Sequence, residues 1–325
     1  MKEKEYREFL HERKQSDEQV EAAVGYVKEF EAYLAETGVG LESLTLPDLK
    51  NYIARLIDAR KNSMDRLLAL ARYAYMAGLN EVFIYFTAIL GGREILPSIA
   101  ERVATLAGDM TRDQIFKDIE VPPLGSPPEE FPPVTARLMD RLLELGPETC
   151  HAVLAHNHHG VPVEHFGKHK EWLREAGDLD SFLKKVHREA IAELERYMKE
   201  GKIWYEQEIT PEVVELVRGN QEMLSAVRDG DYLYTTKIPY SPKDWLGESE
   251  PLMKRYYACH CPLARAVIIG GKPDIPLDWC YCSGGFEKLL FDVVFDQPTQ
   301  VEVLESVLAG DPRCRFRVKI PEGIT

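Results

Sequence analysis

Residues 284–320 read GGFEKLLFDVVFDQPTQVEVLESVLAGDPRCRFRVKI, and the order of patterns in this stretch decides the fold. Apolar residues at helical spacing in 284–295 predict a helix that buries one face. The segments 301–308 and 313–320 read as strands on either side of the turn-forming AGDP, which predicts an antiparallel pair. We therefore expect an α+β fold with an antiparallel sheet.

Upstream of this tail, the sequence predicts further elements of the same domain. Residues 202–210, KIWYEQEIT, and 231–240, DYLYTTKIPY, are dominated by β-branched and aromatic residues, which is typical of strands. Their Tyr and Trp side chains are expected to pack on a half-buried sheet face, although they could equally line an aromatic ligand pocket. Helices are expected at 135–145, 147–155, 165–175 and 180–200.

The first 120 residues predict a bundle of amphipathic helices. Apolar residues recur at helical spacing in VEAAVGYVKEFEAYL, and this helix is expected to end at Gly38 and Gly40. Further helices are expected at 46–60, 64–77, 80–90 and 97–107. Thr45 with Asp48, and Thr111 with Gln114, have the spacing of capping boxes at helix starts.

A proline-rich segment divides the chain. Residues 121–134, VPPLGSPPEEFPPV, contain six prolines, which cannot donate ladder hydrogen bonds and restrict their neighbours. We therefore predict a helical bundle domain at 1–120, a linker at 121–134 and an α+β, cysteine-rich, ligand-binding domain at 135–325.

Composition limits the classes of function. The 325 residues carry 54 acidic and 40 basic side chains, a net charge of −14, which disfavours nucleic acid as a partner because such binding depends on Lys and Arg. The charged opening MKEKEYREFLHERK lacks the apolar core of a signal peptide, and the most apolar stretch, 83–91, is about half a membrane span. We expect a cytoplasmic protein with no membrane segment.

The N-terminal helices resemble a known family. FEAYLAETGVGLESLTLPDLKNYIARL and NSMDRLLALARYAYMAG are similar in helix spacing to the core-binding domain of tyrosine recombinases. The catalytic half of that family needs a His-x-x-Arg element, and none of the nine histidines here is followed at the third position by Arg. We therefore expect these helices to serve packing, contact with a partner or homo-oligomer formation.

Five of the six cysteines lie between residue 259 and the C-terminus, in two Cys-x-Cys pairs and one later position. Thiolates in a reducing compartment favour zinc, which takes four tetrahedral ligands. The predicted ligands are Cys261, Cys280, Cys282 and Cys314. In a regular strand Cys-x-Cys would send its side chains to opposite faces, so we expect turns near Pro262 and at Ser283-Gly284-Gly285, or one ligand from each pair.

Two other uses of the thiols stay open. Free cysteines are often small buried hydrophobic residues. A nucleophilic role is the other alternative, because Lys254, Arg255 and Arg265 would lower the pKa of a neighbouring thiol. The candidate catalytic residues are Cys259, His260, Cys261 and His159.

The tail from Cys261 to Ile320 resembles the 4-vinyl reductase-like domain and the L-2-amino-thiazoline-4-carboxylic acid hydrolase family. The hairpin motif that carries the resemblance, Gly-Asp-x-x-Cys-x-Phe, stands here as Gly310, Asp311, Cys314 and Phe316. The resemblance implies a small-molecule-binding fold with zinc held by an upstream Cys, an acidic residue and two hairpin cysteines. Cys280 and Cys314 match the upstream and final cysteines, Ser306 stands at the intermediate position, and Glu302 and Glu305 lie near the acidic one. The region from 200 onward also resembles an uncharacterised bacterial and archaeal family.

Six of the nine histidines lie in HAVLAHNHHGVPVEHFGKH, residues 151–169. On a helix, His165 and His169 would share a face and could bind one metal with Glu164 or His159. Proton transfer is the alternative use, because imidazole titrates near neutral pH. A mixture of exposed and hydrogen-bonded loop histidines is the third. His156, His158 and His159 flank a turn at Gly160 and are the preferred contributors to a pocket.

These patterns lead to two expected functions, and the acidic balance disfavours a third, a DNA-associated protein that uses the N-terminal helices. The first is a zinc-thiolate protein that binds a small organic ligand and hydrolyses cyclic C–N bonds of amidine or thiazoline type, with a cysteine nucleophile or zinc-bound water and a histidine that moves protons. The second is a non-catalytic, zinc-supported small-molecule sensor with a helical partner-binding domain. The sequence leaves open whether the protein is an enzyme.

Overall fold

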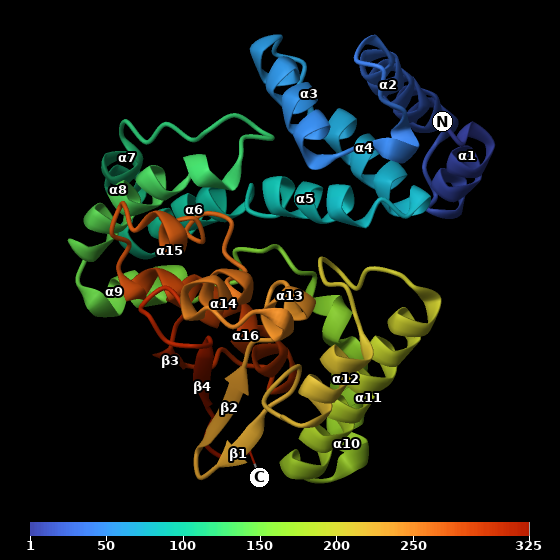
Figure 1. Ribbon diagram of the computed structural model, residues 1–325. Coiled ribbons are helices and arrows are strands. Elements are labelled where there is room, and N and C mark those ends of the chain that lie inside the picture. The colour runs from blue at the N-terminus through green and yellow to red at the C-terminus, as the bar shows by residue number, and fades with distance from the viewer. Residues whose placement is uncertain (325) are drawn as a thin grey trace. The chain divides into compact units, whose positions relative to one another are not determined.

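The computed structural model describes residues 1–324, and the chain divides into two compact units (Figure 1). Unit 1 comprises Met1–Gly91 with Pro122–Glu130, and unit 2 comprises Gly92–Val121 with the chain from Phe131 onward. This division differs from the predicted boundaries at 120 and 134, because the proline-rich segment belongs largely to unit 1 and the helices before it belong to unit 2.

The core contacts explain the division. Ile99 and Val103 of α6 (Ile95–Ala107) are fully buried in one apolar cluster with Leu138 and Leu142 of α8 (Pro132–Leu143), so α6 is part of unit 2. The proline-rich segment is a strap on unit 1. The side-chain amide of Asn62 donates to the carbonyl of Leu124 at 2.7 Å.

Gly125 is a position of this strap that requires glycine. Its φ is +91°, and a Cβ there would lie 3.0 Å from Ile53 and 3.2 Å from Leu67. A side chain at residue 125 would therefore be strained in its backbone and crowded by the core of unit 1.

Unit 1 is a helical bundle, as predicted. Its elements are α1 (Glu3–Glu12), α2 (Asp17–Glu36), the short 3₁₀ helix η1 (Leu41–Ser43), α3 (Leu46–Asp58), α4 (Met64–Ala77), α5 (Asn80–Leu90) and the 3₁₀ turn η2 (Pro128–Glu130). The capping box of Thr45 and Asp48 is present at the start of α3. Fully buried residues such as Leu34, Leu49 and Leu67 come from successive helices and form one core.

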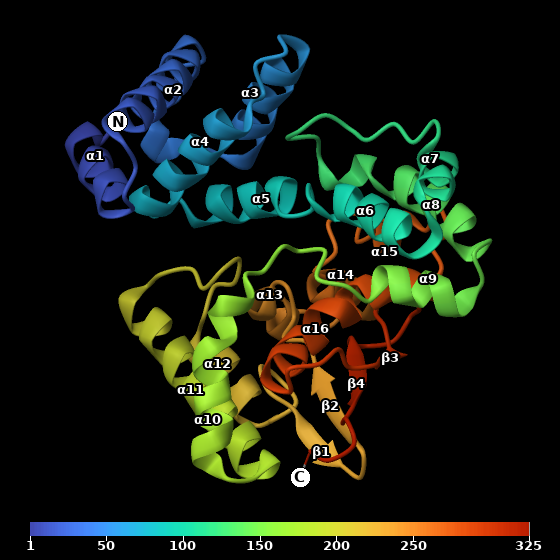
Figure 2. The same ribbon diagram turned by 180° about the vertical axis from the view of Figure 1, so that it is seen from behind.

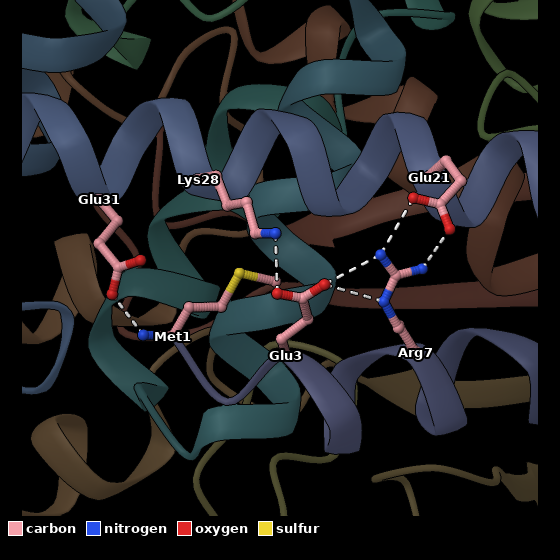
Figure 3. Close-up of polar contacts among 6 residues, drawn as sticks. All are labelled: Met1, Glu3, Arg7, Glu21, Lys28 and Glu31. Carbon is pink, nitrogen blue, oxygen red and sulfur yellow. Dashed lines mark hydrogen bonds and ion pairs between the residues drawn. The ribbon is translucent and has the colours of Figure 1, made fainter.

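Charged side chains connect α1 and α2 on the surface of unit 1 (Figure 3). The Arg7 guanidinium donates to Glu3 at 2.9 Å and to Glu21 at 3.0 Å, and the Lys28 ammonium lies 2.8 Å from Glu3. The amino group of Met1 pairs with Glu31. Exposed ion pairs of this kind each add little stability.

One stretch, Asn80–Ala107, is long and apolar enough to cross a membrane by length and composition. It contains α5 and α6, which are separated by a turn at 91–94. Core helices of soluble proteins meet the same criteria, so this stretch does not assign a membrane location.

Unit 2 combines helices with one small sheet, which confirms the α+β class (Figure 2). Besides α6 and α8, its helices are α7 (Asp109–Phe116), α9 (Pro147–Leu154), η3 (Val163–Phe166), α10 (Gly167–Ala176), α11 (Leu179–Glu200), α12 (Pro211–Arg218), α13 (Pro242–Gly247), α14 (Pro251–Ala258), α15 (Val267–Gly270), η4 (Leu277–Cys280) and α16 (Tyr281–Val294).

The sheet is antiparallel, with the order β1-β2-β4-β3. Its strands are β1 (Val227–Asp229), β2 (Tyr232–Thr236), β3 (Val301–Glu305) and β4 (Arg315–Lys319). Leu233, Phe316 and Val318 are fully buried on the face that packs with Phe291 of α16. The predicted hairpin of the tail is therefore confirmed, with an irregularity in β3 between Val303 and Glu305.

The tyrosines of β2 lie on the other face of the sheet. Arg315 lies over the ring of Tyr234 at 4.9 Å, and Arg317 lies over Tyr232 at 4.4 Å. Both rings are half-buried, and each makes a cation–π contact with an arginine of β4.

Three local predictions were wrong. Residues 202–210 form no extended strand, but a tight turn in which Trp204 and Gln207 exchange backbone hydrogen bonds of 3.0 and 2.8 Å. Ser283-Gly284-Gly285 lies inside α16 rather than in a turn. Thr111 lies inside α7, which begins at Asp109, and its hydroxyl donates to the carbonyl of Ala107 instead of capping a helix.

Candidate functional site

Lys237 is the centre of a charged cluster in unit 2. Its ammonium donates to the Ser283 hydroxyl at 2.9 Å and lies 3.6 Å from a Glu287 carboxylate oxygen. The side chains of Lys237 and Glu287 are 10% and 14% exposed, so this ion pair is largely shielded from water. The Thr235 hydroxyl donates to the other oxygen of Glu287 at 3.2 Å and fixes the carboxylate.

The sequence places these groups through two elements. Lys237 directly follows β2, and its backbone N–H donates to the carbonyl of Cys314 at 3.0 Å, which continues the pairing with the chain before β4. Ser283 and Glu287 are four residues apart in α16, so both face the same side of the helix. Phe286 between them is 39% exposed, and its ring centre lies 4.9 Å from the Lys237 ammonium.

His260 and Glu206 form a second charged pair. His260 Nδ1 lies 3.2 Å from Glu206 Oε1, and its Nε2 lies 2.7 Å from the carbonyl oxygen of Ile238. A carbonyl oxygen only accepts, so Nε2 carries a proton. Burial alone would raise the pKa of Glu206. The hydrogen bond with His260 and the charges of His260 and Lys237 together outweigh this effect of burial, so the net pKa of Glu206 is lowered.

The turn at 204–207, which presents Glu206, has an unusual backbone conformation at Tyr205. Tyr205 has φ +51°, which is rare for a bulky residue, and its side chain is 58% exposed. The Tyr205 ring lies edge-on to Trp204 at 4.8 Å. Positive-φ residues other than glycine are enriched at ligand-binding positions, because the surrounding structure must hold them there.

His159 completes the cluster. Its ring lies edge-on to Phe286 at 5.3 Å, and no other residue between 1 and 324 forms a hydrogen bond with its side chain. Burial by surrounding protein lowers the pKa of His159 to about 4, with further contributions from Lys237, His158 and His260. Its surface is nevertheless exposed to solvent. A neutral imidazole with both nitrogens unpaired therefore lies within electrostatic reach of Lys237 and His260.

The five C-terminal thiols lie near this cluster. Cys259 follows α14, Cys261 lies in the next turn, Cys280 ends η4, Cys282 is inside α16 and Cys314 precedes β4. The Trp279 indole N–H donates to the Cys261 sulfur at 3.2 Å, and the Cys280 sulfur lies 3.0 Å from the Ser306 hydroxyl. Cys314 and Cys259 both influence the pKa of Cys280, so these thiols are close to one another.

Burial raises the pKa of all five thiols. This direction is opposite to the prediction that Lys254, Arg255 and Arg265 would favour thiolates. Arg265 does lower the pKa of Cys259, but burial outweighs it. The guanidinium of Arg255 instead donates to the carbonyl of Val307 at 2.9 Å. Cys259 and Cys261 are therefore poor nucleophiles as placed.

The thiols form no assembled metal site in this arrangement. Within residues 1–324, no group of three or more His, Cys, Asp or Glu side chains is arranged to hold a metal ion. Cys280, Ser306 and Cys314 do lie together, since Ser306 hydrogen-bonds to Cys280 and its hydroxyl also acts to lower the pKa of Cys314. The zinc prediction therefore rests on the chemistry of the thiols and not on their present geometry.

The histidine run separates into different environments. His158 is fully buried between the Ser98 hydroxyl and the Val153 carbonyl, each at 2.8 Å. His165 lies in η3 and His169 in α10, so they do not share one helix face as predicted, although each ring contacts Phe166. Of the preferred pocket histidines, only His159 reaches the Lys237 cluster.

Sequence reasoning identified His159 and His260, but it missed Glu206, Lys237, Ser283 and Glu287. Ser283 and Glu287 had a usable signal, because their spacing places two polar groups on one face of a largely apolar helix. Glu206 and Lys237 gave no such signal in the sequence, because acidic and basic residues in strand-like or loop segments are usually solvated.

Comparison with known proteins adds one match. A family of unknown function, DUF6144, matches residues 241–324, a range that contains His260, Ser283, Glu287 and all five C-terminal cysteines. This match fits the expected resemblance to an uncharacterised family. No curated protein and no solved structure matches the chain.

Proposed function

We propose that unit 2 binds a small organic ligand at the cluster of His159, Glu206, Lys237 and His260. The observation that carries the proposal is His159, whose imidazole is neutral, accessible and without a hydrogen-bond partner in residues 1–324, beside two ion pairs. Structural histidines in folded proteins usually satisfy their ring nitrogens, as His158 does here. An exposed imidazole that makes no hydrogen bond to residues 1–324 and lies among fixed charges is suited to a ligand.

The cluster also offers proton-transfer chemistry. Neutral His159 can accept a proton. His260 and Glu206 share a second proton in the hydrogen bond between Nδ1 and Oε1. Hydrolysis of a cyclic C–N bond would use these groups rather than a cysteine nucleophile, because burial keeps the thiols protonated. A sensor without catalysis would use the same cluster for binding alone.

Zinc binding by Cys280, Cys314 and further thiols is a separate proposal, supported by their proximity and by the preference of zinc for sulfur. Purified protein is expected to carry about one equivalent of zinc by elemental analysis, and Cys280→Ser or Cys314→Ser should lose it. Metal-free protein, with a melting temperature that a chelator does not change, would contradict the zinc proposal. The proposal that a small ligand binds at His159 does not depend on that result.

A ligand screen tests the binding proposal. Saturation-transfer NMR on the full chain should detect binding from a library of small polar heterocycles that includes cyclic amidines and thiazolines. His159→Phe keeps the ring but removes both nitrogens, and it should abolish the binding. His165→Phe, an exposed histidine outside the cluster, is the matched control and should bind normally. Ligands that bind both variants equally would place the site elsewhere.

A further inference from the structure

Arg265 is held between two tyrosine rings. Its guanidinium carbon lies 4.3 Å from the ring centre of Tyr240 and 4.9 Å from that of Tyr256. Tyr240 is buried, while Arg265 and Tyr256 are half-buried. Stacking of this kind fixes the plane of a guanidinium and leaves the N–H groups on its edge directed away from the rings.

The guanidinium has no carboxylate partner. Three other arginines that stack on aromatic rings pair with an acid within 3 Å: Arg66 with Glu29, Arg315 with Glu222 and Arg317 with Glu302. In residues 1–324, by contrast, no acidic oxygen lies within 4.0 Å of Arg265. Arg13 also stacks on rings without an acidic partner in residues 1–324, but it is exposed to solvent, whereas Arg265 is half-buried. A half-buried arginine without a counter-charge is unusual, because burial of an unpaired charge costs free energy.

Arg265 is connected to the candidate site by the segment Lys237–Tyr240. Lys237 begins this segment in the charged cluster, and the carbonyl of Ile238 holds His260. The ring of Tyr240 lies edge-on to His260 at 5.5 Å while its face contacts Arg265. One short stretch of backbone therefore positions both the cluster and the arginine.

Arg265 lacks the acidic partner that the other basic groups of the cluster, Lys237 and His260, have. Lys237 is matched by Glu287, and His260 is matched by Glu206. Arg265 adds one positive charge that no neighbouring carboxylate compensates. A ligand that completes the site would therefore carry a negative charge.

We infer that Arg265 binds an oxyanion of the ligand, so that the site takes small organic acids. The guanidinium fork matches a carboxylate or a phosphate, either of which can accept two parallel N–H donors. This inference rests on the proposed function, and it names the ligand class and the residue that selects it. The tyrosines act as positioning residues, because they hold the fork without contacting the anion.

Matched acid and amide pairs test the inference on the full chain. Benzoate, 2-furoate and succinate are each compared with their carboxamides by saturation-transfer NMR at constant ionic strength, and phenyl phosphate is added to distinguish phosphate from carboxylate. We expect the acids, or the phosphate, to bind, and the amides to bind at least tenfold more weakly.

Variants at Arg265 identify the residue. Arg265→Met should lose the preference for the anion, and Arg265→Lys, which keeps the charge but not the fork, should weaken anion binding about tenfold. Arg13→Met is the matched control, because Arg13 also stacks on two rings, Phe9 at 3.5 Å and Tyr75 at 5.9 Å, but lies in unit 1. Melting temperatures of all three variants report whether each one folds.

Each outcome separates the inference from the proposed function. If acids and amides bind equally, or if Arg265→Met and Arg265→Lys retain wild-type anion binding, the inference is overturned while ligand binding at His159 stands. If the wild type binds no member of either set or of the heterocycle library, both are overturned. Loss of anion preference in Arg265→Met, with Arg13→Met unchanged, supports the inference.

Discussion

The ammonium of Lys237 reaches from the end of β2 to α16, where it lies 2.9 Å from the hydroxyl of Ser283. This contact joins the sheet to the helix that covers it, and it places a largely buried charge where the chain offers Glu287 as its partner. The candidate ligand site therefore lies where the sheet of unit 2 meets α16. Substitutions of its residues should change the free energy of unfolding of unit 2.

Lys237→Met should lower the free energy of unfolding of unit 2 by about 3 kcal/mol, because Glu287 would be left buried without its partner. The double variant Lys237→Met with Glu287→Leu should recover part of this loss, since both charges are then removed. Lys170→Met breaks an exposed pair with Asp296 and should cost less than about 1 kcal/mol. Chemical denaturation of the four proteins measures the coupling, and equal losses in the single and double variants would contradict a paired role.

Gly285→Ala should destabilise unit 2 by about 2 kcal/mol or more, because its Cβ would lie 2.5 Å from the carbonyl oxygen of His156. This close approach holds α16 against the loop that carries His159. Gly25→Ala is the matched control, since Gly25 also lies within a helix but has nothing within 4 Å of its Cβ position.

The control should be neutral or stabilising by up to about 1 kcal/mol, because alanine is the better helix former. Thermal melting of both variants measures the difference. A Gly285→Ala protein as stable as the wild type would show that α16 and the loop do not pack as closely as described.

His159 should remain neutral until the pH falls to about 4, compared with 6.5 for an ordinary histidine. The folded pKa lies below the unfolded one, so the unfolded chain binds the extra proton first, and stability is lost as the pH falls from about 6.5 to about 4. An NMR titration of the imidazole Cε1–H signals measures this pKa directly.

Lys237→Met should raise the pKa of His159, because the Lys237 charge contributes to its depression. A His159 signal that titrates near 6.5 in the wild type would contradict the described surroundings of the ring.

The C-terminal thiols should react slowly with iodoacetamide in the folded protein. Burial raises the pKa of Cys259, Cys261 and Cys282, so the thiolate fraction at pH 8 is below that of a free peptide thiol. Mass spectrometry of timed samples measures modification at each cysteine, with the denatured chain as the fast reference. Any of these cysteines that reacts faster than the reference would restore the nucleophile hypothesis.

Much of the secondary structure could be predicted because local patterns decide it. The helix predicted at 64–77 coincides with α4, and the tail hairpin follows from strand patterns around AGDP. The strand predicted at 202–210 failed because its aromatic residues pack around a tight turn, in which Tyr205 adopts positive φ. No propensity signals that choice.

The site was only partly predictable, for a physical reason. His159 and His260 stand out by residue type, whereas Glu206 and Lys237 acquire their importance from tertiary contacts that join segments far apart in the chain. The pKa values of the thiols are shifted in the direction opposite to the one expected, because nearby basic residues are visible in the sequence, while burial is not.

The most direct test of the ligand site follows the imidazole signals of the full chain by NMR during titration with a binding compound from the screen. We predict a saturable shift of the His159 signal, with no change at His165. A compound that binds without moving His159, or a library from which nothing binds, would contradict the central claim.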